Sequence, residues 1–515
     1  MRRHPSAFAA AVLLATLPAV HAQEEKPRAE AKTPSPVVTT HTITVGGKRL
    51  AYEATAGVLP LTDDEGKKTA EVFFVAYTIP VEDRAARPVT FCFNGGPGSS
   101  SVWLHMGAFG PKRVPLAKDG TAPPPPPARL VDNEHTLLDL TDLVFIDPVT
   151  TGYSRAAGPK EARKFHGVEG DVRSVGEFIR LYLGRYERWA SPKFLAGESY
   201  GTTRAAALAQ HLQERHGINL NGVILISAVL NFQTIRFDRG NDLPYVLFLP
   251  SYAATAWYHK KLAPELQEDL ARTLREAEEF AEGEYATALL KGDGLGEERK
   301  KEVAAKVARY TGLSEEFVRR ANLRVEIGRF TKELLRSGRR TVGRYDSRAE
   351  GIDRDAAGER HEYDPSYAAI QGAYTAAFNH YVRDELQFRR DANYEILTGK
   401  VRPWDYGPAT NRYLNVADDL RQAMTYNPYL RVFAAAGYYD LATPYFATDY
   451  TVRHLGLEPP LRGHVTTANY RGGHMMYTVP GEHRKLKEDL AAFYRSALGQ
   501  QVPQSVAGSG TPVNR

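Results

Sequence analysis

The sequence predicts an α/β protein whose central sheet is mostly parallel and covered by helices on both faces. Short apolar runs typical of buried strands alternate with longer segments of helical composition, which is the pattern of such a sheet. Between residues 238 and 404 the composition changes to segments rich in Ala, Glu, Lys, Leu and Arg, which favour helices. We therefore expect a helical cap over 238–404, inserted between two parts of the sheet domain, 38–237 and 405–500.

Each expected element has a local signal. Alternating polar and apolar residues between His41 and Tyr77 predict antiparallel hairpins that lead the sheet. Ser314, followed by two glutamates, is a typical helix start within the cap. Aromatic residues between 245 and 258 either line a substrate cavity or form the core of the cap. The expected core strands are 89–93, 143–146, 194–196, 223–226, 430–436 and 465–470, with a helix over 168–189 and cap helices within 264–290, 297–310 and 314–335.

The N-terminus has the pattern of a secretory signal peptide. Arg2 and Arg3 precede an apolar stretch over residues 7–20, and small residues before and at Ala22 suit cleavage there. The stretch is too short for a comfortable membrane span, and no other run reaches the roughly eighteen apolar residues that a span requires. We expect a periplasmic or secreted protein. The expected order is a signal peptide over 1–22, a flexible tether over 23–37, the core with its cap, and a disordered tail over 501–515.

Composition excludes several classes of function. A formal net charge of +5 over 515 residues is too weak to predict nucleic-acid binding. No set of Cys and His residues has the spacing of a metal site, and no glycine-rich phosphate loop is present, so neither a metal nor a cofactor is expected. Cys92 is the only cysteine, and its apolar surroundings in the sequence predict a buried side chain. A chain with so few cysteines fits a bacterial periplasm better than a disulfide-forming eukaryotic lumen.

The strongest functional signal is the pentapeptide Gly-Glu-Ser-Tyr-Gly over residues 197–201. It follows an expected strand and precedes an alanine-rich helical segment, the context in which a G-x-S-x-G serine becomes an exposed nucleophile. A serine nucleophile needs a base and a carboxylate that orients the base. Asp440 and His474 each follow an expected strand, and their order after Ser199 is the one that this arrangement requires.

A second glycine-rich segment, Asn-Gly-Gly-Pro-Gly over residues 94–98, follows the expected strand 89–93. Glycines after a strand let the backbone turn its N–H groups toward a ligand, as an oxyanion hole requires. Together with residues 197–201, Asp440 and the sequence around His474, this segment resembles the ordered signature of the serine carboxypeptidase family of α/β-hydrolases. Residues 146–154 resemble a further landmark of that family.

The resemblance implies an α/β-hydrolase fold and a role for each matching residue. Ser199 would be the nucleophile, Asp440 the orienting acid and His474 the general base. The backbone N–H groups of Gly96 and Tyr200 would form the oxyanion hole.

Members of the family remove single residues from peptide C-termini. There the Asn of the glycine turn and the Glu before the nucleophile bind the terminal carboxylate, which implies these roles for Asn94 and Glu198. Because an ionised glutamate repels a carboxylate, Glu198 must be protonated when a peptide binds.

The chain departs from the family at Ala108, where members commonly carry a second Glu that shares a proton with the Glu beside the nucleophile. We therefore expect a broader or less acidic pH optimum than in relatives with paired acids. The most direct interpretation is an exported serine carboxypeptidase that acts on peptides through an acyl-enzyme. An aminopeptidase, an esterase or acyltransferase, and a non-catalytic binding module with the same fold remain alternatives.

Overall fold

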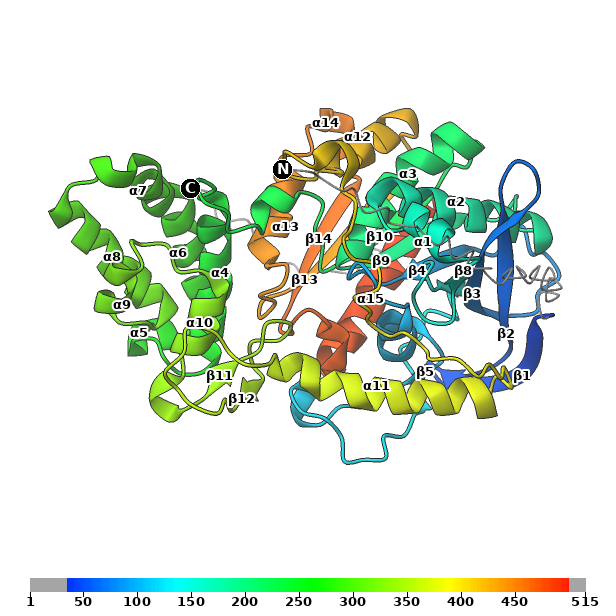
Figure 1. Ribbon diagram of the computed structural model, residues 1–515, viewed down its shortest axis with the longest axis horizontal. Coiled ribbons are helices and arrows are strands. Elements are labelled where there is room, and N and C mark those ends of the chain that lie inside the picture. Colours follow the sequence, from blue (N-terminus) through cyan, green and yellow to red (C-terminus); the bar gives the residue numbers. More distant parts are fainter. Residues whose placement is uncertain (1–34, 500–515) are drawn as a thin grey trace, which may run out of the picture.

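The computed structural model describes residues 35–499, which form a sheet domain with a large helical insertion (Figure 1). The expected signal peptide, most of the expected tether and the expected tail lie outside these residues. The main sheet has ten strands in the order β1-β2-β3-β7-β4-β9-β10-β13-β14, and β8 pairs with β3 outside this path. The strands are β1 (Val37–Val45), β2 (Lys48–Thr62), β3 (Lys68–Thr78), β4 (Val89–Phe93), β7 (Asp142–Ile146), β8 (Arg155–Ala156), β9 (Lys193–Glu198), β10 (Gly222–Ile226), β13 (Arg431–Gly437) and β14 (Val465–Tyr470).

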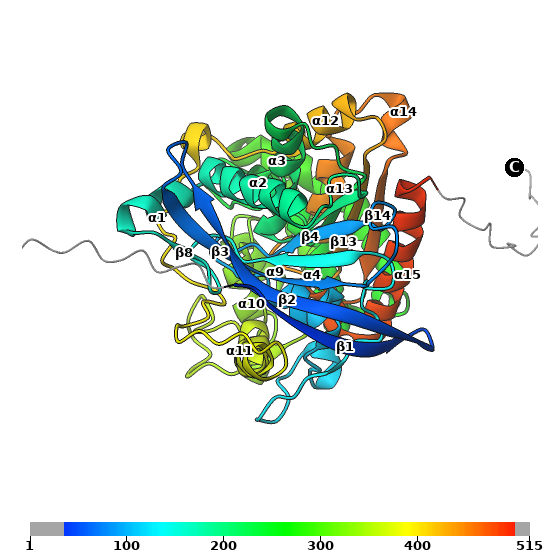
Figure 2. The same cartoon turned by 90° about the vertical axis from the view of Figure 1, so that its right-hand side faces the viewer.

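Six neighbouring strands, from β7 to β14 in the sheet order, run parallel. The pairs β1–β2 and β2–β3 are antiparallel, as the alternating pattern between His41 and Tyr77 predicts, and β3 also pairs with β7 in antiparallel register. Figure 2 shows the long hairpin of β1 and β2 crossing in front of the parallel strands. The sheet is therefore the mostly parallel α/β-hydrolase sheet expected from the sequence.

Helices cover both faces of the sheet because successive side chains of each strand point to opposite faces. The strand residues that pack with α2 (Val168–Arg185), α3 (Tyr200–His216) and α12 (Ala417–Tyr426) include Phe91, Phe93, Leu195, Val223, Leu225 and Val432. Those that pack with α11 (Pro365–Asp384) and α15 (Pro480–Ala497) include Cys92, Phe194, Ala196, Ile224 and Phe433. Cys92 is fully buried, as predicted. The remaining helices of the sheet domain are α1 (Pro159–Phe165), α13 (Tyr445–Arg453) and α14 (Pro459–Arg462).

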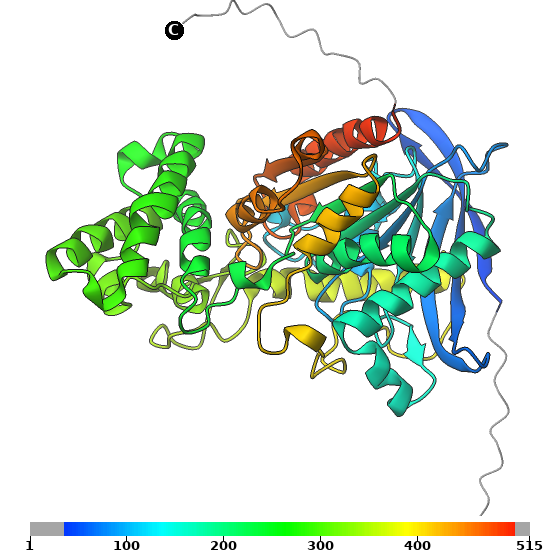
Figure 3. The same ribbon diagram turned by 90° about the horizontal axis from the view of Figure 1, so that it is seen from above.

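The insertion between β10 and β13 begins with a helical lobe that projects from the sheet domain (Figures 1 and 3). Its helices are α4 (Leu243–Tyr258), α5 (Pro264–Gln267), α6 (Leu270–Phe280), α7 (Ala286–Lys291), α8 (Glu297–Thr311), α9 (Glu315–Arg320) and α10 (Ile327–Glu333). The lobe has its own apolar core, which continues onto α13. Ser314 caps α9, as predicted, by accepting a hydrogen bond from the N–H of Phe317 at 3.1 Å.

The second part of the insertion behaves differently, because α11 packs into the apolar core of the sheet domain rather than covering it from outside. After α11, the chain returns over the sheet domain and forms isolated β-bridges at Glu395, Leu397, Asp405 and Asn415. Two small hairpins complete the structure: β5 (Lys112–Arg113) with β6 (Val131–Asp132), and β11 (Thr341–Val342) with β12 (Glu350–Gly351). The parallel strands β4, β9, β13 and β14 all end at one edge of the sheet, where the residues predicted to act follow them.

Candidate active site

Ser199 is the single residue between the end of β9 and the start of α3. Its φ of 59° and ψ of −129° are strained for a residue with a side chain. The flanking glycines are required by space: a Cβ on Gly197 would lie 2.2 Å from the carbonyl oxygen of Gly201, and a Cβ on Gly201 would lie 2.8 Å from that of Phe93. The structure confirms the predicted strand, sharp turn and helix around Ser199.

His474 and Asp440 follow the neighbouring parallel strands β14 and β13, and both side chains are buried. Nδ1 of His474 donates to Oδ2 of Asp440 at 2.7 Å. The carboxylate also accepts the N–H groups of Ala442 and Thr443 at 2.7 and 3.0 Å, and the hydroxyl of Thr443 at 2.8 Å. The bond to Asp440 holds the proton on Nδ1 and makes Nε2 the basic nitrogen of the ring.

Opposing effects act on the imidazole of His474. Burial disfavours the imidazolium, but the charge and hydrogen bond of Asp440 favour it more, so the pKa of His474 is raised from its ordinary value. The carboxyl group of Glu198 also raises this pKa, and the guanidinium of Arg344 lowers it. An imidazole whose protonated form is stabilised in this way accepts a proton readily, as a general base must.

The backbone amides of Gly96 and Tyr200 border the same cavity as Ser199. Tyr200 is the first residue of α3, so no carbonyl of the helix accepts its N–H. Gly96 has a φ of +103°, which residues with a side chain rarely adopt. The two loops touch, since a Cβ on Gly95 would lie 2.3 Å from the backbone nitrogen of Tyr200. Both amides are thus available to an oxyanion beside the serine.

Glu198 lies buried beside Ser199 and is bonded on both oxygens. Nδ2 of Asn94 donates to Oε1 at 2.9 Å, and the hydroxyl of Tyr477 donates to Oε2 at 2.5 Å. The amide of Asn94 is oriented by the N–H of Leu104, which donates to Oδ1 at 3.1 Å. Burial raises the pKa of Glu198 to about 7, although the bonds from Tyr477 and Asn94 act in the opposite direction. A protonated Glu198 and an adjacent amide can together bind a carboxylate.

Ala108 is fully buried in the π-helix Leu104–Phe109, and its carbonyl accepts hydrogen bonds from Asn133 and His483. The neighbouring residue, Gly107, faces the aromatic side chains beside Glu198. A Cβ there would lie 2.6 Å from the hydroxyl oxygen of Tyr374 and 2.6 Å from the ring of Tyr477. The group that contacts the second oxygen of Glu198 is therefore a phenol rather than a second carboxyl.

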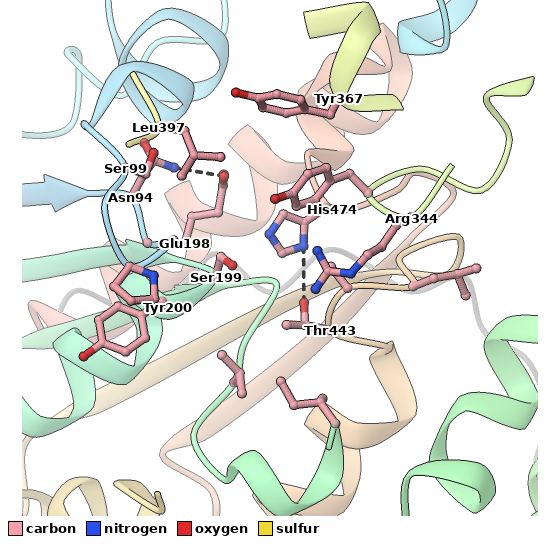
Figure 4. Close-up of a pocket in the computed structure, with 18 of the residues that line it drawn as sticks. Asn94, Ser99, Glu198, Ser199, Tyr200, Arg344, Tyr367, Leu397, Thr443 and His474 are labelled. Atoms are coloured by element: carbon pink, nitrogen blue, oxygen red, sulfur yellow. Dashed lines mark hydrogen bonds between the residues drawn. The ribbon is translucent and has the colours of Figure 1, made fainter. Parts of the chain in front are cut away.

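These residues line one cavity of about 640 Å³. Figure 4 shows Asn94 and Glu198 on one side of Ser199, with His474 and Arg344 on the other. Six of the seven predicted site residues line the cavity: Asn94, Gly96, Glu198, Ser199, Tyr200 and His474. The seventh, Asp440, does not line it and is hydrogen-bonded to His474.

The helical insertion supplies much of the opposite wall, including Phe248, Ile327, Tyr367 and Ile370. Phe248 is the one residue of the aromatic cluster 245–258 that lines the cavity. Tyr252 instead stacks on Phe330 inside the lobe, with ring centroids 3.9 Å apart. The aromatic cluster therefore belongs mainly to the core of the lobe.

Sequence reasoning missed three residues of the site: Tyr477, Thr443 and Arg344. Thr443 follows Asp440 by three residues, a spacing typical of side-chain-capped turns, and this is the one clue that was present. Tyr477 and Arg344 reach the site only because distant segments meet, since Tyr477 is 279 positions from Glu198.

Over residues 35–499, no group of three or more His, Cys, Asp or Glu side chains is arranged to hold a metal ion. Within the same residues, no helix has both the length and the apolar character needed to cross a membrane.

The family model and the related proteins that match this chain indicate the same family. The model of the serine carboxypeptidase family matches residues 47–479. Serine carboxypeptidase-like 45 of Arabidopsis thaliana is 26% identical over 197 residues, which cover 37% of this chain and 39% of that protein. The pheromone-processing carboxypeptidase KEX1 of Zygosaccharomyces rouxii is 27% identical over 185 residues, covering 34% of this chain and 25% of that protein. The matches thus span two fifths or less of these two relatives.

Solved structures with similarity along the chain include a thermostable carboxyl esterase from Bacillus coagulans, at 12% identity and a TM-score of 0.33, covering 86% of this chain and 99% of the esterase. A lipase in an open form is similar at 15% identity with a TM-score of 0.34, covering 86% of this chain and all of the lipase chain. The fold assignment rests on the strand order and parallel register of the chain itself.

Proposed function

Because this chain belongs to the serine carboxypeptidase family, we propose that it is an exported serine carboxypeptidase that removes residues from peptide C-termini through an acyl-enzyme. The observation that carries the proposal is the buried pair Asn94–Glu198 beside Ser199. The pair places groups suited to a carboxylate in the cavity that also contains the imidazole of His474. A free C-terminus bound there sets the last peptide carbonyl near the serine hydroxyl.

In the proposed first step, Oγ of Ser199 bonds to the carbonyl carbon of the last peptide bond, and its proton passes to Nε2 of His474. The amides of Gly96 and Tyr200 donate to the oxyanion. The C–N bond then breaks, the leaving amino acid takes the proton from His474, and the shortened peptide remains as an ester on Ser199.

Water completes the proposed cycle. It gives a proton to His474 while its oxygen bonds to the acyl carbon; the ester bond breaks, and Ser199 recovers the proton. Asp440 keeps the imidazole oriented and stabilises its positive charge in both steps.

Mass spectrometry of N-blocked peptides incubated with the protein tests this function. We expect stepwise shortening from the C-terminus, and no shortening of the same peptides with an amidated C-terminus, because the amide lacks the charge that Asn94 and Glu198 bind. Shortening of unblocked peptides from the N-terminus would instead indicate an aminopeptidase.

Other outcomes would indicate other chemistry on the same fold. Hydrolysis of esters alone would indicate an esterase, and transfer of the acyl group to an added alcohol would indicate an acyltransferase. If a fluorophosphonate failed to label Ser199, the protein would instead be a non-catalytic binding module.

Export is supported by the sequence pattern of residues 1–22. N-terminal sequencing of the protein recovered from the periplasm or the medium is expected to begin at Gln23. Full-length protein that stays in the cytoplasm with Met1 or Arg2 at its N-terminus would contradict export without affecting the proposed activity.

A further inference from the structure

The cavity is lined by more positively charged than negatively charged side chains. Its lining residues include three arginines, Arg236, Arg344 and Arg402, and one carboxyl group, that of Glu198. Glu198 is buried, and its raised pKa of about 7 keeps it largely neutral in mildly acidic solution. The three arginines are exposed. Arginine keeps its charge at all physiological pH values, so the cavity has a positive field.

These arginines come from three separate segments. Arg236 precedes α4, Arg344 lies in the turn between β11 and β12, and Arg402 lies in the chain that returns after α11. The three arginines are more than fifty residues apart along the chain, and the fold brings them to one cavity. The positive charge of the cavity therefore does not come from a single run of basic residues.

Two of the three guanidinium groups, those of Arg236 and Arg344, lie over aromatic rings rather than beside acids. Arg236 lies over the ring of Phe232 at 5.6 Å, and its Nη2 donates to the hydroxyl of Tyr406 at 3.3 Å. Arg344 lies over the ring of Tyr345 at 5.4 Å. Aromatic faces orient a guanidinium without neutralising its charge.

Other arginines of the insertion differ in this respect. Arg324 is bonded to Asp242 through two nitrogens, and Arg348 is bonded to Asp346. Among residues 35–499, no carboxylate forms a salt bridge with Arg236, Arg344 or Arg402; the three arginines thus present free charge to whatever enters the cavity.

Arg344 has a defined place relative to the reacting groups. Its charge acts on the imidazole of His474, whereas the pKa of Glu198 is set by other groups. In Figure 4, His474 lies between Glu198 and Arg344. A peptide whose terminal carboxylate is bound at Glu198 and whose last peptide bond is at Ser199 continues on the side of Arg344.

We propose that this carboxypeptidase prefers peptides with an acidic residue immediately before the bond that is cut, and that Arg344 is the residue that recognises that side chain. The inference rests on the proposed function. A planar guanidinium binds a carboxylate through two parallel hydrogen bonds, which a neutral isostere of the acid cannot match. Arg236 and Arg402 add a longer-range attraction that salt screens.

The test compares two N-blocked dipeptides that differ only in one group, blocked Glu-Leu and blocked Gln-Leu. We expect wild-type kcat/KM to be about tenfold higher for the Glu peptide at low ionic strength, the lower end of the effect of a hydrogen bond to a charged group. In R344Q the Glu-to-Gln ratio is expected to fall to about one. The ratio cancels any effect of Arg344 on the pKa of His474, because both peptides meet the same imidazole.

R320Q is the matched control, since Arg320 is an exposed arginine of α9 that is paired with Glu316 and does not line the cavity. Its Glu-to-Gln ratio is expected to equal that of the wild type. Equal wild-type rates on both peptides, or an equal loss on both in R344Q, would overturn the acidic preference while leaving the carboxypeptidase function in place. Failure of the wild type to release leucine from either peptide would instead overturn the function.

Discussion

The hydroxyl of Tyr477 donates a 2.5 Å hydrogen bond to Oε2 of Glu198, and both side chains are buried. Burial raises the pKa of the phenol well above its ordinary value, so the phenol is a permanent donor. A donor to the carboxylate favours its ionised form, which opposes the rise that burial produces in the pKa of Glu198. If a peptide carboxylate binds at Glu198 as proposed, the pH dependence of that binding is expected to depend on this contact.

Replacing Tyr477 by Phe is expected to raise the pKa of Glu198 above its value of about 7, because a bond that favours the ionised form is removed. The proposed binding of a peptide carboxylate requires the protonated form of Glu198, so the fall of kcat/KM at alkaline pH is expected to move to higher pH, by about one unit for a hydrogen bond to a charged group. The measurement is kcat/KM for an N-blocked peptide between pH 5 and 9.

Tyr374→Phe is the matched control, because the buried hydroxyl of Tyr374 lies close by but makes no hydrogen bond among residues 35–499. Its alkaline limb is expected to stay at the wild-type position. If kcat/KM fell at the same alkaline pH in both variants and in the wild type, Tyr477 would have no effect on the pKa of Glu198.

Replacing Glu198 by Gln removes the titrating group but keeps its shape. With a pKa of about 7, Glu198 ionises between pH 6 and 8, so the ratio of wild-type to E198Q kcat/KM is expected to fall about tenfold over this range. The amide of E198Q does not ionise, so the pH dependence that remains in this variant is expected to be a rise in kcat/KM as His474, whose pKa is raised, loses its proton.

A neutral ester substrate without a terminal carboxylate provides the control for E198Q. Neither protein should show the alkaline limb with it, since no carboxylate meets Glu198. If kcat/KM of E198Q for peptides also fell about tenfold between pH 6 and 8, the loss of activity at alkaline pH would belong to a group other than Glu198.

Ser199→Ala and Asp440→Asn test the reacting groups. Loss of the nucleophile, or of the carboxylate that holds the proton on Nδ1 of His474, is expected to lower kcat by at least about a thousandfold. Circular dichroism and the thermal midpoint establish whether each variant is folded. A folded Ser199→Ala protein that retains most of the peptidase activity would remove Ser199 from the mechanism.

Arg204 of α3 joins this helix to the loop of Asn94. Its Nε donates to Asp171 at 2.7 Å and its Nη1 to the carbonyl of Asn94 at 2.6 Å, and its side chain is 1% exposed. Arg204→Met leaves the buried Asp171 without its partner. The free energy of unfolding in urea is expected to fall by about 3–5 kcal/mol.

Arg173→Met on α2 removes an arginine from an exposed pair with Glu169 and is the control for Arg204→Met. Its free energy of unfolding should change by no more than about 0.5 kcal/mol. Equal effects of the two substitutions would show that burial of Arg204 is not the cause.

Much of the sheet was predictable because its strands are buried on both faces. Residues 89–93 and 223–226 are apolar throughout, and each forms a strand within a residue of the expected bounds. Composition also predicted the helices between residues 264 and 335 of the insertion, but it gave no bounds for α4 or α11 and did not indicate what any of these helices packs against. α11 packs into the sheet core, while α8 belongs to the separate core of the lobe. Composition indicates that a helix forms and leaves open which surface will bury it.

The sequence by itself determined the elbow at Ser199, the order of Asp440 and His474, and the glycine turn after β4. These depend on residues adjacent in the chain, where sterics allow few conformations. Only the tertiary structure decided that the phenol of Tyr477 contacts Glu198 and that Arg344 lines the cavity. Both depend on contacts between distant segments, and such contacts arise from the packing of the whole chain rather than from any local pattern.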